Sequence, residues 1–213
     1  MVVIRSASPA DAAQIAAVRR ESWLAAYQGI FGRQVIDRVT APDGGARIRQ
    51  SFRIRPWQRM IAAVGVPSPQ APGLVQAPGL AQAPGRARVP EPEPEREPAI
   101  VGYASFGPEQ DVLEAPWPHP LTAAGTDGQV AELYALYVHP DWWSTGTGRA
   151  LMDRSLARVT AAGYTSITLW VLQDNARARR FYGRAGFAAD GARHVLDDLG
   201  GVTEIRYRRP LGG

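Results

Sequence analysis

The sequence of 213 residues contains neither cysteine nor lysine. Without cysteine there is no disulfide and no mechanism in which a cysteine thiolate carries an acyl group, whereas the compartment stays open. No apolar run reaches the roughly 18 residues of a membrane span, and no group of side chains has metal-ligand spacing. The first residues lack the pattern of a signal peptide, so we expect a cytoplasmic protein with no membrane partner and no metal.

The charged residues give a mild basic excess. The chain has 24 basic and 20 acidic residues, which gives a formal net charge of +4 and a pI of about 9.8. The arginines gather in residues 177–184 and 206–209, as they would on a nucleic-acid-binding surface. Because the excess is small, a solvated arginine face explains the pattern better, and we predict no nucleic-acid partner.

Residues 67–98 differ in composition from the rest of the chain. They repeat Gln-Ala-Pro-Gly three times, starting at Gln70, Gln76 and Gln82, and then alternate proline with glutamate. Proline without periodic apolar residues builds neither a helix nor a strand. We therefore predict a disordered Pro-rich insert between two strands, with a docking site of the PxxP type as the alternative.

The most informative stretch is a strand, a glycine turn and a helix start in direct succession. Val130–Val138 is an almost wholly apolar run that predicts a buried strand, and Met152, Leu156 and Val159 have helical spacing. Between them lies Gly146-Thr147-Gly148-Arg149. Unpaired backbone N–H groups and the positive end of a helix dipole meet there, and glycines keep Cβ atoms away from an anion. The turn therefore suits a phosphate, but plain turn chemistry would give the same pattern.

A second strand and helix follow within about 30 residues. Residues 165–172 are rich in β-branched and aromatic side chains, which predicts another buried strand. Asn175 then stands at an N-cap position and Gly186 just past the end of the expected helix. The apolar stripe of that helix comprises Ala178, Phe181, Tyr182 and Ala185.

The two segments together resemble the GCN5-related N-acetyltransferase superfamily. Gly146 and Gly148 match the glycines of its pyrophosphate loop, Gln/Arg-x-x-Gly-x-Gly/Ala, although Trp143 stands where the motif has Gln or Arg. Its second motif is Asn-x-x-Ala-x-x-Phe-Tyr-x-x-x-Gly-Phe. This chain matches it at every fixed position, with Asn175, Ala178, Phe181, Tyr182, Gly186 and Phe187.

The resemblance implies one α/β (α+β) domain over residues 1–213. It implies a mixed, mostly antiparallel sheet of six to seven strands flanked by about four helices, in the order β-α-α-β-β-β-α-β-α-β-β. Hydrophobic patterning predicts strands at residues 2–5, 58–66, 99–106, 130–138, 165–172, 188–195 and 202–208. Helices are expected from Ser8 or Asp11 to Tyr27, over residues 34–51 with a break at 42–45, from the Gly146 turn, and from Asn175.

The resemblance also implies acetyl-CoA as cosubstrate and no metal. Because the chain has no cysteine, the acceptor would attack the thioester directly or the chain would need another nucleophile. The residues expected to bind the cosubstrate come from the end of a strand, the turn and the second helix. They are Leu136, Tyr137, Val138, Ser144, Thr145, Gly146, Thr147, Gly148, Arg149, Asn175, Ala178 and Phe181.

Two side chains are the expected catalytic residues. The family pattern assigns Tyr182 as the acid that protonates the leaving thiolate; the alternative is a core aromatic beside Phe181. Glu132 is the candidate base, because it is the one charged residue in its strand and a buried carboxylate is costly. The alternatives are a strand-end role for Glu132, and His139 as the base, although His139 lies in a His-Pro-Asp turn.

The expected reaction is transfer of an acetyl group to a primary amine, carried by a small molecule or by a protein or peptide. Residues 23–30 and the loop 107–128 would form the acceptor wall, but Trp23 and Tyr27 could equally be core residues. A non-catalytic acyl-CoA-binding sensor or interaction module is the alternative function. A homodimer is left open.

Overall fold

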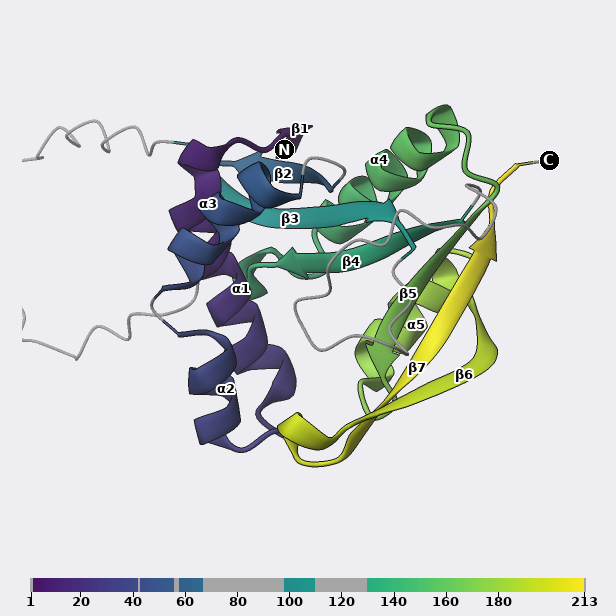
Figure 1. Cartoon of the computed structure of the whole chain (residues 1–213). Helices are drawn as coiled ribbons and strands as arrows, with labels where there is room; N and C mark the ends of the chain where they lie inside the picture. Colours follow the sequence, from purple (N-terminus) through teal and green to yellow (C-terminus); the bar gives the residue numbers. More distant parts are fainter. Residues whose placement is uncertain (1, 42, 56–57, 67–97, 110–129, 213) are drawn as a thin grey trace, which may run out of the picture.

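A computed structural model describes residues 2–41, 43–55, 58–66, 98–109 and 130–212 of the chain. Within these residues, seven strands form one mixed sheet in the order β1-β2-β3-β4-β5-β7-β6 (Figure 1). All neighbouring pairs are antiparallel except β4 and β5, which are parallel. The strands are β1 (Val2–Ser6), β2 (Arg59–Gly65), β3 (Ala99–Pro108), β4 (Val130–Val138), β5 (Ser166–Leu172), β6 (Ala188–Leu196) and β7 (Val202–Pro210).

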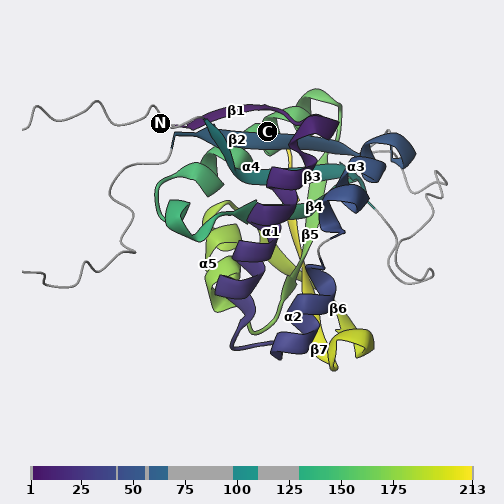
Figure 2. The same ribbon diagram turned by 90° about the vertical axis from the view of Figure 1, so that its left-hand side faces the viewer.

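Helices cover both faces of the sheet (Figures 1 and 2). On one face, Leu151, Met152 and Leu156 of α4 pack into the larger core cluster. On the other, Ile15 and Val18 of α1 pack against β2 and β3. The α-helices are α1 (Ala12–Tyr27), α2 (Arg33–Val39), α3 (Gly44–Ile54), α4 (Thr147–Ala161) and α5 (Ala176–Arg184).

The predicted fold is confirmed, with one correction in the helix count. The described residues contain five α-helices rather than about four, because the break predicted at residues 42–45 separates α2 from α3. The insert predicted at residues 67–98 lies outside the described residues, apart from Pro98. The ladder of β2 and β3 reaches Gly65 and Ala99, which pair directly on either side of that insert.

The feature that positions the site is the divergence of β4 from β5. Only Val130, Ala131 and Glu132 of β4 pair with β5, after which the two strands separate (Figure 1). A bulge at Tyr134 interrupts the pairing of β4 with β3 at the same level. A bulge inserts one residue and so reverses which side chains face each side of the sheet. As a result Leu133 packs in the α4 cluster, whereas Tyr137 packs on the α1 face.

Candidate active site

The turn before α4 presents backbone N–H groups to the gap between β4 and β5. Gly146 caps the helix with φ +90°, and Ser144 also has a positive φ, +64°, which is uncommon for a residue with a side chain. Turns that alternate between right- and left-handed backbone form concave anion sites. Gly146 has no side chain to cap the helix, and Ala150 is the first residue to donate back, to the Gly146 carbonyl at 2.9 Å. The first N–H groups of α4 therefore remain available to a ligand.

Trp143 anchors this turn to the end of β4. Its indole N–H donates to the Val138 carbonyl at 2.7 Å, and the Ser22 hydroxyl of α1 donates to the same carbonyl at 2.8 Å. The Arg177 guanidinium lies over the Trp143 ring, 3.6 Å from its centroid. These contacts join α1, the turn and α5 at one point.

The second motif forms α5 and its caps as predicted. The Asn175 side chain accepts a hydrogen bond from the Ala178 N–H at 3.0 Å, which satisfies one of the free donors at the helix start. Gly186 follows the helix with φ +84°, the left-handed conformation expected of a residue just past a helix end. Tyr182 packs edge-on against Phe181 and Phe187, with ring centroids 5.3 and 6.1 Å away.

A pocket of about 460 Å³ lies where these elements meet. Most of the cosubstrate residues expected from the sequence line it, together with Tyr182; Thr145, Thr147 and Glu132 do not. The expected residues in the lining are Leu136, Tyr137, Val138, Ser144, Gly146, Gly148, Arg149, Asn175, Ala178, Phe181 and Tyr182.

Three tyrosines from three elements interact in the lining of this pocket. They are Tyr27 of α1, Tyr137 of β4 and Tyr182 of α5. Burial, and after it the neighbouring Tyr137, raises the pKa of Tyr182 well above the ordinary tyrosine value. Burial and then the charges of Tyr137 and Tyr182 raise the pKa of Tyr27 in the same direction. Tyr182 is therefore a protonated hydroxyl at neutral pH, the state that an acid catalyst requires.

The structure separates Glu132 from this pocket. Glu132 is buried at the opposite end of β4, opposite Thr168 of β5, where the two strands still pair. Val138 lies six residues along the strand from Glu132, which amounts to ~20 Å of chain. His139 also lies outside the lining; its Nδ1 accepts a hydrogen bond from the Asp141 N–H at 3.3 Å, the turn chemistry considered above.

Several lining residues were not expected from the sequence. Trp23 is a core residue, stacked on Phe31 at 5.7 Å between ring centroids, whereas Tyr27 reaches the pocket, so the two residues have different roles. Most of the acceptor loop proposed at residues 107–128, including Trp117 and His119, lies outside the described residues. The further lining residues are Ser22, Ala26, Trp142, Trp143, Arg177, Arg180 and Arg184.

The spacing of three of these arginines was the signal that sequence reasoning missed. Arg177, Arg180 and Arg184 follow one another at i, i+3 and i+7, the same helical spacing as an apolar stripe. A solvated face was the favoured interpretation of these arginines, and contact of some of them with the anionic cosubstrate was the alternative. With Arg149 they surround the pocket with positive charge.

Two further observations concern the described part of the chain. None of its helices is long and apolar enough to cross a membrane. Nor do its histidine and carboxylate side chains gather in a group of three or more that could hold a metal ion.

Comparison with known proteins gives one family. The Acetyltransferase (GNAT) family matches residues 82–187. The chain is 35% identical over 124 residues to a protein named mycothiol acetyltransferase from Parafrankia sp., covering 56% of this chain and 34% of that protein. An uncharacterized N-acetyltransferase of Mycobacterium bovis is 42% identical over 69 residues, which are 32% of this chain and 43% of that protein. The chain thus spans only about a third of the mycothiol acetyltransferase that it matches.

Solved structures of low sequence identity share the whole fold. The PaiA N-acetyltransferase from Thermoplasma acidophilum, in complex with coenzyme A, aligns with a TM-score of 0.60 at 17% identity, over 99% of both chains. A GCN5-related N-acetyltransferase from Kribbella flavida aligns with a TM-score of 0.57 at 19% identity, over 99% of this chain and 98% of that one.

Proposed function

This chain belongs to the acetyltransferase (GNAT) family, and we propose that it transfers the acetyl group of acetyl-CoA to a primary amine. The observation that carries the proposal is the pocket in which the Gly146 turn, the arginines of α5 and the Tyr182 hydroxyl meet. The turn and the arginines suit a pyrophosphate, and the tyrosine suits a leaving thiolate. One ligand, a thioester of a phosphorylated thiol, needs both.

The pocket residues fit this cosubstrate. The free N–H groups at the start of α4 would donate hydrogen bonds to the pyrophosphate oxygens. Gly148 leaves room for the pyrophosphate, because even an added Cβ there would meet only side-chain atoms of Phe181 and Val138, at 3.5 Å or more. Arg149, Arg177, Arg180 and Arg184 would balance its charge. The thioester supplies an acyl carbon that a neutral amine can attack.

The transfer needs a proton removed from the amine and a proton given to sulfur. A lysine-type amine is protonated at pH 7 and must become neutral before its lone pair forms the new C–N bond. As the C–S bond breaks, Tyr182 donates its hydroxyl proton to the thiolate. The excess proton on the nitrogen then returns to the tyrosinate, so that the hydroxyl is restored.

For the acceptor we favour a small-molecule amine. The support comes from relatives named mycothiol acetyltransferase, one of which matches 56% of this chain.

The test is release of free thiol from acetyl-CoA with a panel of small amines, aminoglycosides and peptides, beside calorimetry with acetyl-CoA and with coenzyme A. Binding with thiol release that depends on one class of amine supports the proposal. Binding without release by any amine would favour the alternative, an acyl-CoA-binding sensor or interaction module. Absence of binding would refute both.

A further inference from the structure

None of the described residues that line the pocket is a carboxylate or an imidazole, the side chains that most often deprotonate an ammonium group. Among the described residues, its lining contains four arginines and three tyrosines of which two have a raised pKa, but no aspartate, glutamate or histidine. Direct transfer nevertheless requires an acceptor for that proton. Within the part of the chain that the structure describes, the base must therefore come from a surface that adjoins the lining.

Glu204 of β7 lies on the face of the sheet against which Tyr27 packs. In the sheet, Glu204 lies opposite Leu172 of β5 on one side and His194 of β6 on the other. Directly paired residues share a face, and Leu172 packs with Trp23 of α1 and Ile36 of α2. Glu204 therefore points to the α1 face of the sheet.

The charge of Glu204 acts on the Tyr27 hydroxyl, and that hydroxyl interacts in turn with Tyr137. Tyr27 and Tyr137, which both line the pocket, pack in the same cluster as Leu172, the residue opposite Glu204 in the sheet.

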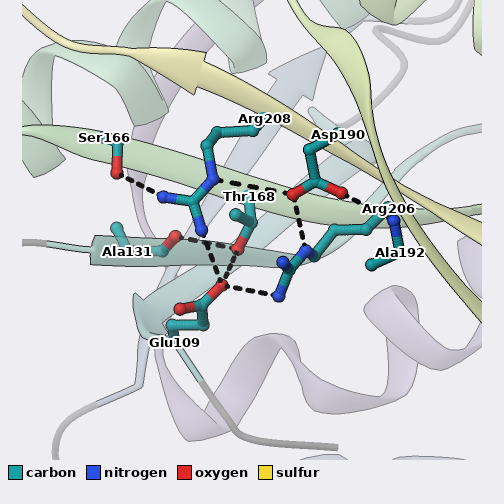
Figure 3. Close-up of polar contacts among 8 residues, drawn as sticks. All are labelled: Glu109, Ala131, Ser166, Thr168, Asp190, Ala192, Arg206 and Arg208. Atoms are coloured by element: carbon teal, nitrogen blue, oxygen red, sulfur yellow. Dashed lines mark hydrogen bonds and ion pairs between the residues drawn. The ribbon is translucent and has the colours of Figure 1, made fainter. Parts of the chain in front are cut away.

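Unlike the acids beside it, Glu204 is not neutralised by an arginine. Farther along the α1 face, Arg206 donates to Asp190 at 2.7 Å and pairs with Glu109 at 3.4 Å, and Arg208 joins the same network (Figure 3). Within the described residues, the half-buried Glu204 carboxyl makes neither a hydrogen bond nor an ion pair.

The pKa values differ accordingly. Burial raises the pKa of Glu204 to about 7. At Asp190 burial acts in the same direction, but the Ala192 N–H and Arg206 outweigh it and hold the pKa below its ordinary value. Of these two acids, only Glu204 can take up and release a proton near neutral pH.

We propose that Glu204 is the base that receives the proton of the acceptor amine. This inference rests on the reaction proposed above. The ammonium group enters over β5 and β7, between the Glu204 carboxylate and the tyrosines. Glu204 takes one N–H proton, and the neutral amine then attacks the acyl carbon from the side of Tyr27. After transfer, Glu204 releases that proton to solvent, so the net products are the amide, the free thiol and one proton.

Other polar groups on the neighbouring elements lie on the same face of the sheet as Glu204 or interact with Tyr27. On α2, Arg38 is held by the Asp198 carbonyl. The remaining groups are Tyr27 of α1, Tyr137 of β4, Trp170 of β5, Tyr182 of α5, His194 of β6 and Arg206 of β7. Glu204 carries the negative charge among these groups, and a negative charge there suits the binding of a cationic substrate.

The test compares Glu204→Gln with wild type and with Glu21→Gln, a control on the exposed side of α1. Acetyl-CoA affinity is measured by calorimetry, and kcat/KM for the best amine is measured from pH 5.5 to 10. Glutamine keeps the size of the side chain and removes its basicity. We expect Glu204→Gln to bind acetyl-CoA normally and to lose roughly 10²-fold in kcat/KM at pH 7. The control should behave as wild type.

The pH profile separates a base from a structural role. The wild-type rate should rise through about pH 7. In Glu204→Gln, kcat/KM should rise instead with the pKa of the amine. For an amine that is already neutral at pH 7, the substitution should lower kcat/KM much less. Wild-type rates and profile in Glu204→Gln would overturn the proposal, as would loss of the pH 7 step in Glu132→Gln instead. A wild-type protein that acetylates no amine would refute the proposed function itself, and this inference with it.

Discussion

The Arg177 guanidinium stacks on the Trp143 ring at 3.6 Å, and this contact joins the first turn of α5 to the turn before α4. Trp143 occupies the position where the family motif has Gln or Arg. In this chain the positive charge beside the turn comes from α5, and the tryptophan holds it there. The departure from the motif is therefore compensated by a residue in the second motif.

Trp143→Ala should weaken acetyl-CoA binding by roughly 3- to 30-fold, the range of a stacked cation–π pair. Trp143→Phe keeps a ring under Arg177 but loses the indole N–H bond to Val138, so it should lose less. Calorimetry on both variants separates the two contributions. Equal losses in the two would show that the indole hydrogen bond, rather than the stacking, is what binding needs.

Gly148→Val should weaken acetyl-CoA binding at least tenfold, or by about 1.4 kcal/mol. A Cβ at Gly148 would already lie 3.5 Å from Phe181 and 3.7 Å from Val138, so a branched side chain must turn toward the phosphate site. Gly148→Ala should be milder. The control is Gly183→Ala in α5, where an added Cβ meets nothing within 4 Å. If calorimetry gave unchanged affinity for a folded valine variant, the turn would not be the phosphate site.

The local parts of this site were predictable because they depend on short-range chemistry. The Gly146 turn, the Asn175 cap and Gly186 are each recognisable from a few neighbouring residues, and the structure has them where they were expected. The strands were likewise within a few residues of their predicted bounds.

The sequence did not predict which side chains from distant parts of the chain come together at the pocket. Tyr137 reaches the pocket because the bulge at Tyr134 reverses the facing of β4, and no local pattern in an apolar strand marks such a bulge. Glu204 lies on the sheet face against which Tyr27 packs because β7 pairs with β5, which is a property of the whole sheet. Glu132 stood out in the sequence as a lone charge, but its place where β4 and β5 still pair keeps it out of the pocket lining.

Replacing residues 67–97 with Asn-Gly should leave the fold and acetyl-CoA affinity intact. Gly65 and Ala99 already pair at the end of the ladder of β2 and β3, so a short turn can join the strands there. Loop closure depends weakly on length, and the gain in stability should not exceed about 2 kcal/mol. Thermal melting and calorimetry check this. A much lower melting temperature or weaker binding would assign the insert a role in the domain.

Asp11→Asn should destabilise the protein by about 1–2 kcal/mol at pH 7, with allowance for the solvent exposure of Arg5. Arg5 donates two hydrogen bonds of 2.7 Å to the Asp11 carboxylate and lowers its pKa from 3.8 to about 2, against the opposing effect of burial. Because the pKa of the Asp11 carboxyl is lower in the folded state, its charge stabilises the fold fully at pH values above the pKa of the unfolded chain, near 4. This contribution is lost as the pH falls toward 2.

Urea unfolding between pH 2 and pH 7 measures that contribution. The difference between wild type and Asp11→Asn should therefore shrink in acid. Asp43→Asn removes an exposed pair with Arg47 and should change stability by less than about 0.5 kcal/mol at any of these pH values. A pH-independent difference between wild type and Asp11→Asn would mean that the carboxylate charge is not what stabilises this corner.

Tyr182→Phe should lower single-turnover rates by roughly 10²-fold or more while acetyl-CoA affinity and folding remain unchanged. The ring is held by Phe181 and Phe187, and phenylalanine keeps both contacts. Only the hydroxyl is lost, so the effect should appear in kcat more than in KM. Because burial raises the pKa of Tyr182, the wild-type rate should not fall through loss of this proton below about pH 10. Single-turnover measurements are needed because slow product release can hide a chemical step. A variant with wild-type single-turnover rates would leave Tyr182 as a packing residue and require another donor for the thiolate.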